Sequence, residues 1–261
     1  MDLAARLRAQ IASQGLPPPS ASLLTGLTTT RSPPPPLPSL AATAKARLLA
    51  CDLTGSNLLD MAKLSAFPAG VQDGNVKELV LQRDIHVQVV DIENLSLSRW
   101  EQIEELESIE RGERTRGRQV VRVADEESSS ANGNGNGNGN GNGNGGSERS
   151  NAAAGAVANA PGVAQAGRNA THRLVLQDCK GVRVYAAELK RIEGIGVSKT
   201  SIGCKMLIRT GTAVARGTLL LTPENCVLLG GKIDAWHDVW LRERMAKLKE
   251  AVGAGRDGTS A

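Results

Sequence analysis

The chain has 261 residues, a formal net charge of +4 and an aromatic content of only 2%. At this length it holds one or two domains, and its Pro-rich and Gly-rich stretches leave roughly 150 residues that can fold around a buried core. No apolar run approaches the ~20 residues of a membrane span and no signal peptide is recognisable, so we expect a soluble intracellular protein. The charge is basic at both ends but acidic between residues 51 and 127. This distribution favours a protein that binds partners over a uniformly basic nucleic-acid coat.

Residues 1–76 are predicted to form a helical cap with Pro-rich spacers. The stretch "LAARLRAQIASQ" places Leu3, Leu7 and Ile11 on one helical face, and the short apolar segment "SASLLTGL" follows it. The stretch "RSPPPPLP" predicts a polyproline spacer, with an SH3 or WW ligand as the alternative. A third helix is predicted over "SLAATAKARLLACDL", with Ser39 as its N-cap.

The first strand is predicted within "KELVLQRDIHVQVVDIENL". Apolar residues alternate with polar ones at Ile85, Val87 and Val89, and β-branched residues are abundant, as in a half-buried strand. A helix follows over "SLSRWEQIEELESIERG", where Ser98 and Glu101 have the spacing of a capping box. Its predicted apolar stripe consists of Trp100, Ile103, Leu106 and Ile109.

Residues 112–170 are predicted to be a disordered insertion. They contain "ANGNGNGNGNGNGNGG", with seven Asn-Gly pairs in tandem. One Asn-Gly between alternating apolar runs would predict a hairpin. Here no apolar side chain is available to offset the entropy lost on ordering, so the tract is expected to stay a solvated coil.

Short strands resume after Thr171. A hairpin is predicted from "RLVLQD" and "GVRVYAAEL", joined by "CKG". Further strands are predicted in "CKMLIRTG" and in "ARGTLLLTPENCVLLGG", on both sides of a turn at Pro223. The segment "KIDAWHDVWLRERMAKLKEAV" predicts an amphipathic helix, and residues 253–261 a disordered tail. The apolar side of this helix contains Ile233, Trp236, Trp240, Leu241 and Leu248.

These elements predict a mainly β fold with helical additions. Short antiparallel strands with helical covers are typical of a small, partly open five-stranded barrel of the oligonucleotide/oligosaccharide-binding (OB) type. We place this domain at residues 77–252 and the insertion 112–170 between its first and second strands. This arrangement requires the first strand to pair with strands that follow the insertion, so the insertion interrupts one domain rather than joining two.

The sequence favours no catalytic, cofactor or metal site. His86, His172 and His237 are scattered, and the four cysteines are far apart without metal-binding spacing, so they are expected to be reduced and mostly buried. The stretch "GIGVSKTSIG" lacks the Gly before Lys199 and the following helix that a phosphate-binding loop requires. We interpret it as a connector between strands and expect a protein that is not an enzyme.

Single-stranded DNA binding is the alternative that an OB barrel invites. Such binding uses aromatic platforms in a basic groove, and Tyr185 is the only aromatic residue on a predicted strand. Weak phosphate contact through surface cations stays open, with a solvated surface as the simpler interpretation. The candidate cations are Arg173, Lys180, Arg183, Lys190 and Arg191.

Several stretches resemble one known family. The run "GTLLLTPENCVLLGGKIDAWHDVWLRERMAKLKEAV", preceded by "CKMLIRTGTAVAR", resembles the closing part of the N-terminal barrel of the RecQ-mediated genome instability protein 1 family. The stretch "IHVQVVDIENLSLSRWEQIEELESIERG" is similar to the family's first strand and following helix. Residues 219–231 are the most specific part, whereas Thr222 stands where relatives often have Lys. The absence of a second barrel is typical of the family's short, fungal-type form.

The resemblance implies a nuclear, non-catalytic scaffold bound to a type IA topoisomerase (topoisomerase III) and a Bloom-type RecQ helicase. Its implied roles are decatenation and dissolution of double Holliday junctions, with the barrel binding the topoisomerase and the insertion entering or propping its gate. Candidates for the gate contact are Arg114, Arg116, Arg118, Val120, Val121 and Val123. Candidates for the partner interface are Thr222, Pro223, Glu224, Asn225, Trp236 and Trp240. Both tryptophans could equally cover the open end of the barrel.

Overall fold

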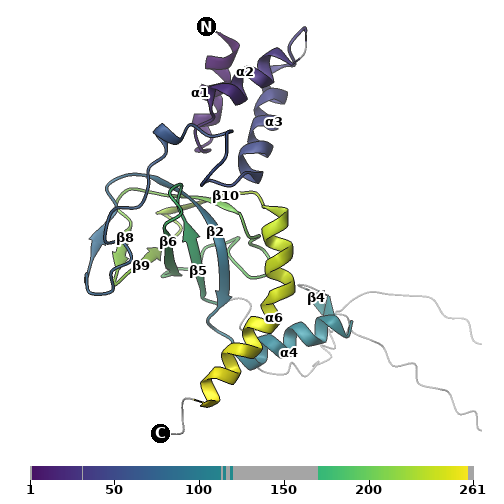
Figure 1. The fold of residues 1–261 in the computed structure, drawn as a ribbon, viewed down its shortest axis with the longest axis vertical. Coiled ribbons are helices and arrows are strands. Elements are labelled where there is room, and N and C mark those ends of the chain that lie inside the picture. The colour runs from purple at the N-terminus through teal and green to yellow at the C-terminus, as the bar shows by residue number, and fades with distance from the viewer. Residues whose placement is uncertain (1, 31, 113, 116–117, 120–169, 258–261) are drawn as a thin grey trace, which may run out of the picture.

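The computed structural model describes residues 2–30, 32–112, 114–115, 118–119 and 170–257. A helical cap lies at one end, a β-barrel in the middle, and two crossing helices at the other end (Figure 1). No helix in these ranges is long and apolar enough to cross a membrane.

The cap is built from α1 (Leu3–Ser13), α2 (Ala21–Thr29) and α3 (Leu37–Ala50), followed by a short 3-10 helix, η1 (Met61–Lys63). Leu7, Ile11 and Leu48 are fully buried in a core that is separate from the barrel core. The predicted N-cap at Ser39 is wrong, because α3 starts earlier and Pro36 is its N-cap. Proline suits a helix start, since the first backbone N–H groups have no intrahelical acceptor.

The boundary between cap and barrel lies before residue 76. Phe67 and Val71 are buried in the barrel core, so the chain has already joined the barrel at that point. The predicted cap, residues 1–76, therefore includes a segment that belongs to the barrel. The reason is that this segment has no regular strand or helix by which a pattern could assign it.

The barrel is one eight-stranded sheet with the order β1-β8-β9-β6-β5-β2-β7-β10. Its strands are β1 (Leu79–Val80), β2 (Ile85–Asn94), β5 (His172–Gln177), β6 (Arg183–Glu188), β7 (Lys205–Ile208), β8 (Ala213–Ala215), β9 (Thr218–Leu221) and β10 (Cys226–Gly230). The predicted count of five is too low, and two of the missed strands, β1 and β8, are too short to produce an alternating pattern. The expectation of purely antiparallel pairing is also wrong, since β6 and β9 pair in parallel.

Strand β2 pairs with strands on the far side of the insertion. It is antiparallel to β5, from Gln88 opposite Gln177 to Asn94 opposite His172, and antiparallel to β7 on its other edge. The prediction that the insertion interrupts a single sheet is thus confirmed. Residues 113, 116–117 and 120–169, which include the Asn-Gly tract, lie outside the described residues.

A β-bulge in β2 changes which residues face the barrel core. The register against β5 shifts between Val89 and Asp91, leaving Val90 as the extra residue. Before the bulge the residues that face the barrel core are the odd-numbered Ile85, Val87 and Val89, whereas Ile92 faces it after the bulge. Because a bulge re-aims side chains, Val90 and Asp91 both lie on the outer side of the sheet.

The cap rests on a row of polar residues that crosses the outer face of the sheet. Gln88 is opposite Gln177 on one side and Lys205 on the other. Its amide donates to Asp52 Oδ1 (2.7 Å), and its Oε1 accepts from the backbone N–H of Leu53 (3.1 Å). Gln88 and Lys205 are fully buried at this joint. The cap is therefore attached to the barrel by buried hydrogen bonds as well as by apolar contacts.

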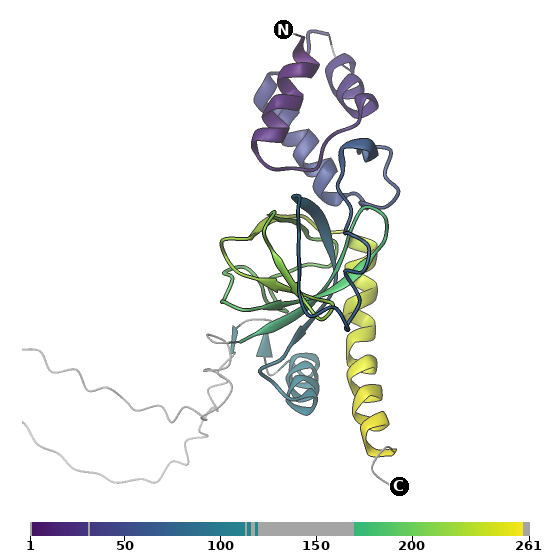
Figure 2. The ribbon, with the colours of Figure 1, turned by 90° about the vertical axis from the view of Figure 1, so that its left-hand side faces the viewer.

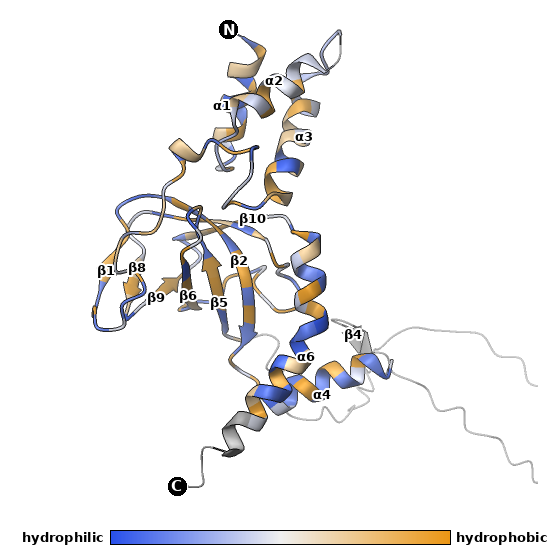
Figure 3. Ribbon diagram, in the orientation of Figure 1, coloured by the Kyte–Doolittle hydropathy of each residue, from blue (hydrophilic) through white to orange (hydrophobic). Residues whose placement is uncertain are grey.

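Helices α4 (Arg99–Glu110) and α6 (Asp234–Asp257) pack against each other beyond the barrel. Figure 2 shows α6 running along one side of the barrel and continuing past it to α4. Hydrophobic and hydrophilic residues alternate along α6, as its amphipathic sequence predicts (Figure 3). Because α6 continues to Asp257, the tail predicted from residue 253 starts too early. The two-stranded ribbon of β3 (Arg114–Thr115) and β4 (Arg118–Gln119) follows α4.

Candidate partner interface

The end of β2 and the start of β5, which flank α4 and the insertion, are held together at one edge of the barrel. The backbone N–H of Leu95 donates to the carbonyl of Thr171 (2.9 Å), and the N–H of Thr171 donates to Ser96 Oγ (2.9 Å). Asn94 and His172 are opposite each other in the β2–β5 pair. The connection between β2 and β5, which comprises α4 and the insertion, therefore leaves and re-enters the sheet at the same place, which we call the insertion root (residues 94–98 and 170–172).

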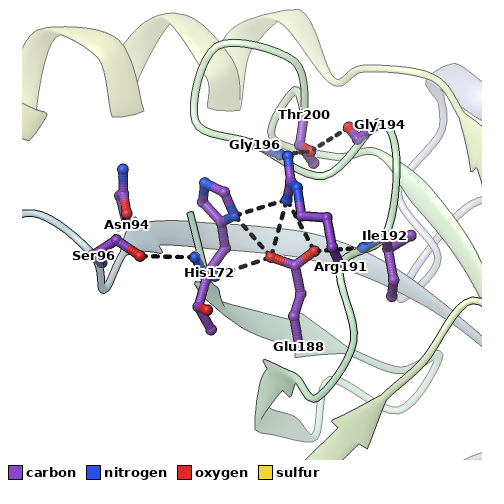
Figure 4. Close-up of polar contacts among 10 residues, drawn as sticks. Asn94, Ser96, His172, Glu188, Arg191, Ile192, Gly194, Gly196 and Thr200 are labelled. Carbon is purple, nitrogen blue, oxygen red and sulfur yellow. Dashed lines mark hydrogen bonds and ion pairs between the residues drawn. The ribbon is translucent and has the colours of Figure 1, made fainter. Parts of the chain in front are cut away.

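A buried charged cluster supports the root from below (Figure 4). His172 Nδ1 lies 2.8 Å from Glu188 Oε2, and the backbone N–H of His172 donates to the same oxygen (2.9 Å). Arg191 donates to Glu188 Oε1 (3.0 Å), as does the backbone N–H of Ile192. Burial raises the pKa of Glu188, but these hydrogen bonds and the nearby charges of His172 and Arg191 outweigh it, so the pKa is lowered. A charged Glu188 thus ties the returning strand to the turn after β6.

The sequence interpretation missed this cluster by treating His172 as one of three scattered histidines. A signal for it exists in the β5–β6 hairpin. Counting outward from the turn at residues 178–182 places His172 opposite Glu188, because Arg173 pairs with Ala187. A histidine opposite a glutamate at the open end of a hairpin is a cross-strand pair that register alone predicts.

Helix α4 links residues 94–98, the first part of the insertion root, to α6. The predicted capping box is confirmed: Ser98 Oγ accepts from the N–H of Glu101, and the Glu101 carboxylate accepts from the N–H of Ser98. Buried Gln102 donates to the carbonyls of Asn94 (3.0 Å) and Leu97 (3.1 Å). The predicted apolar stripe is only partly buried, since Ile103 is buried but Trp100 is 54% exposed.

Contacts between α4 and α6 hold both helices beside the root. Arg244 donates to Gln102 Oε1 (3.3 Å), and Lys249 forms an ion pair with Glu107 (2.8 Å). A cavity of about 260 Å³ lies between the root, these two helices and the loop at residues 196–201. In that loop Thr200 Oγ1 accepts from the N–H of Gly196 and donates to the carbonyl of Gly194 (Figure 4). These two hydrogen bonds hold the loop in a compact turn.

The gate-contact candidates fall mostly outside the described residues. The backbones of Arg114 and Arg118 lie in the β3–β4 ribbon, next to α4. Arg116, Val120, Val121 and Val123 are not described. Their proposed role in contacting a partner stays a prediction.

The partner-interface candidates separate into two groups. Residues 222–225 form the turn between β9 and β10, where Asn225 Oδ1 accepts from the N–H of Thr222 (2.8 Å) and its amide donates to the carbonyl of Leu220 (3.0 Å). Pro223 and Glu224 are exposed at its tip, where Glu224 pairs with Lys190. This turn is internally braced by these hydrogen bonds, and its contact with a partner stays a prediction.

The two tryptophans of α6 have different roles. Trp240 is 6% exposed, and its indole N–H donates to Asp91 Oδ1 (2.7 Å). Its ring is sandwiched by His237 and Arg244. Trp240 is therefore buried against β2 and packs with the barrel core. Trp236 is only partly buried and lines a surface groove of about 650 Å³ between α6 and the sheet.

Most of the candidate DNA-contacting cations are already engaged. Arg173 pairs with Glu93 and lies 5.1 Å from the centre of the Tyr185 ring, Lys190 pairs with Glu224, and Arg191 pairs with Glu188. Lys180 and Arg183, on the β5–β6 hairpin, are exposed and have no carboxylate partner among the described residues. Helix α6 also occupies part of the sheet face beside Tyr185. These contacts disfavour a nucleic-acid platform on this face.

The described residues contain little reactive chemistry. The four cysteines are free thiols, and all but the half-buried Cys51 are buried. Burial raises the pKa of Cys226 to about 12, so its thiol stays protonated. In the described parts of the chain no group of three or more His, Cys, Asp or Glu side chains could hold a metal ion.

Comparison with known proteins gives concordant matches. The family model described as "RMI1, N-terminal OB-fold domain" matches residues 67–244, and "RMI1, N-terminal helical domain" matches residues 11–56. RecQ-mediated genome instability protein 1 from Schizosaccharomyces pombe is 29% identical over 167 residues. That alignment covers 63% of this chain and 63% of the relative, so the chain spans less than two thirds of the relative's length.

Proposed function

Because the chain belongs to the RMI1 family, over both its N-terminal helical and OB-fold domains, we propose that it is a scaffold subunit of a nuclear topoisomerase III–RecQ helicase complex. In this proposal the barrel binds the topoisomerase and the inserted segment biases its gate. The complex would then promote decatenation, dissolution of double Holliday junctions and genome stability. The subunit contributes surfaces rather than chemistry.

The insertion root is the observation that carries the proposal. Both legs of the inserted segment start from a braced site, with α4 held against α6 and Thr171 held against Ser96. A partner bound to the barrel would therefore meet the insertion in a defined direction. If the insertion is the solvated coil that its sequence predicts, its root-mean-square reach is ~40 Å, enough to cross a large cavity in a partner.

The proposed mechanism is a shift of an equilibrium. A topoisomerase of type IA opens a protein gate to pass a DNA strand. If the inserted segment binds the open gate more tightly than the closed one, it favours the open state by the difference between the two binding free energies. No covalent step by this chain is required.

Deleting the insertion tests whether the barrel binds the topoisomerase while the insertion acts on its gate. Replacing Glu113–Asn169 by a short Gly-Ser linker should leave binding to topoisomerase III unchanged, because the barrel and root remain. Decatenation of linked DNA circles should fall markedly. As a matched control, Asn132–Gly145 is replaced by Gly-Ser of equal length, which should preserve decatenation if that tract supplies length alone. Loss of binding in the deletion variant would instead place the interface within the insertion.

An independent single-stranded-DNA-binding module is the alternative function. Exposed Tyr185, together with the exposed cations Lys180 and Arg183 on the same β5–β6 hairpin, is the observation that favours it. Titration of a fluorescent oligonucleotide at low and physiological salt separates the two functions. Sub-micromolar affinity at physiological salt would support the alternative, whereas weak binding that disappears with salt fits the scaffold. Pull-down with mass spectrometry distinguishes an adaptor for an unrelated complex.

A further inference from the structure

A groove on the outer face of the barrel has apolar side chains exposed on both its floor and its wall. The floor is a row across three strands, in which Asp91 is opposite Val175 and Val175 is opposite Tyr185. The bulge adds Val90 to this floor. Tyr185 is 51% exposed, beside a sheet face that α6 occupies only in part.

The wall of the groove is the first part of α6. Ala235, Trp236 and Val239 face the floor across about 650 Å³ of space. Trp236 packs against the barrel core, and Val239 is 39% exposed. These three apolar residues extend the apolar surface of the floor. The groove is thus bounded by two rigid elements and is part of the folded structure without a ligand.

The pairing of the strands limits what can lie in the groove. Strand β2 is paired with β5 and β7, β5 with β2 and β6, and β6 with β5 and β9. The floor therefore has no free strand edge to which an extended peptide could add. A strand lying there would leave its own N–H and C=O groups without partners, whereas a helix satisfies them internally. An amphipathic helix beside α6 is the occupant that this surface fits.

The charges around the groove define the polarity of its occupant. Glu243 and Lys247 pair with each other (3.1 Å), and Asp91 accepts the indole N–H of Trp240. Arg183 lies on the rim and is exposed without a carboxylate partner among the described residues. A complementary helix would place an acidic side chain or its negative C-terminal end beside this guanidinium.

We propose that the groove between α6 and strands β2, β5 and β6 binds an amphipathic helix of a partner protein. The helix packs apolar residues, spaced one turn apart, between Tyr185 and Val239 and sets a carboxylate against Arg183. This surface is separate from the insertion root. The proposal holds for whichever protein supplies the helix.

The first test uses a displayed library of helical peptides and the full-length protein. Peptides are selected on the wild type and counter-selected on the Val239→Glu variant, which adds a charge at an exposed position and should fold normally. The matched control is Val80→Glu, because Val80 is 40% exposed but lies on β1, away from the groove. We expect selected peptides with apolar residues at i, i+3 and i+4 and an acidic residue near one end. They should bind Val239→Glu at least about tenfold more weakly and Val80→Glu as tightly as the wild type.

Reversal of charge tests the orientation. Arg183→Glu should weaken acidic peptides and restore binding of the same peptides when the acidic residue is changed to Lys. Three outcomes would each overturn the proposal. The selection could yield no peptide that distinguishes the wild type from Val239→Glu, or it could yield extended sequences without helical spacing. The third outcome is that Val80→Glu weakens peptide binding as much as Val239→Glu does. Purified topoisomerase III and RecQ helicase form a second arm. If the wild-type protein binds neither enzyme, the proposed function is contradicted. The proposal for the groove is decided separately, by the peptide selection.

Discussion

Lys205 is a fully buried cation at the joint between cap and barrel. Its ammonium donates to the carbonyl of Gly203 (2.7 Å), and burial lowers its pKa to about 8 although Cys51, Cys204 and Asp52 oppose this shift. A cation in such a place costs folding free energy, because water solvates it better than the protein does. The residue thus makes the stability of the joint depend on pH.

The sign of this dependence follows from the two pKa values. The folded pKa of about 8 lies below the value of 10.5 in the unfolded chain, so the unfolded state binds more protons between them. The full penalty is present below pH 8, and the free energy of unfolding rises as pH increases towards 10.5. We expect Lys205→Met to stabilise the protein by about 1–3 kcal/mol at pH 7, with a gain that shrinks by pH 10.

Urea unfolding followed by tryptophan fluorescence at pH 7 and pH 10 checks this expectation. Lys45→Met, at an exposed position of α3, is the control and should show no such pH-dependent difference. A stability difference between Lys205→Met and the wild type that stays constant over this range would contradict the assignment of the pH dependence to Lys205.

At the residue scale, local patterns were predictable and long-range polar contacts were not. The capping box of Ser98 and Glu101 depends on a spacing of three residues, which the sequence displays directly. Gln88 was predicted only as a position on a strand, yet it is buried because cap residues thirty-six positions earlier cover it. No local pattern reports that Asp52 and Gln88 meet.

Among the elements, the connection from β10 to α6 depends on two consecutive glycines in left-handed conformations. Gly230 has φ +87° and open space where a Cβ would lie. At Gly231, with φ +93°, a Cβ would lie 2.4 Å from the carbonyl oxygen of Leu49 in α3. The cap approaches the barrel closely only because Gly231 has no side chain.

This difference gives a matched pair of substitutions. Both Gly230→Ala and Gly231→Ala place a side chain at positive φ, at a cost of about 1 kcal/mol. Gly231→Ala should destabilise the protein by about 1–3 kcal/mol more, because the Leu49 backbone must move away. Thermal unfolding measures the difference, and limited proteolysis between the cap and barrel should increase only for Gly231→Ala. Equal effects of the two substitutions would show that the close contact with Leu49 does not matter.

Strand predictability followed length and alternation. The stretch containing β2 alternates clearly, and the hairpin of β5 and β6 has a recognisable turn, so both were predicted. The three-residue strand β8 has no pattern of its own and exists because β1 and β9 pair with it. The parallel pairing of β6 with β9 brings together strands separated by a long loop and by β7 and β8, and this connection carries no sign of the pairing.

At the scale of the whole molecule, the pairing of β2 with β5 makes residues 85–94 and 172–177 parts of one sheet. A break in the chain within the insertion should therefore leave the fold intact. We expect a protein with a protease site inserted between Gly139 and Asn140 to remain one particle after cleavage. The fragments should co-elute in size-exclusion chromatography and unfold in a single cooperative transition.

The matched control for this experiment carries the site in the turn at Pro223, where cleavage cuts directly between β9 and β10. Fragments of the insertion-cleaved protein that separate without denaturant would mean that the two halves fold independently. The architecture was predictable at this scale because one topological inference, the pairing across the insertion, determines it. The candidate site was less predictable, since the groove depends on the bulge at Val90 and on where α6 lies.

The hydrogen bonds between Leu95, Ser96 and Thr171 also make this position a natural graft point. Since the chain re-enters the sheet where it left, the distance that a replacement of the whole β2–β5 connection must span is set by the root and not by the replacement. Lengthening a flexible loop adds only about 0.6 kcal/mol for each doubling. A fluorescent protein or an affinity epitope could therefore be inserted here without perturbing the barrel. For the same reason, related chains can differ in the length and sequence of this connection while keeping the same fold.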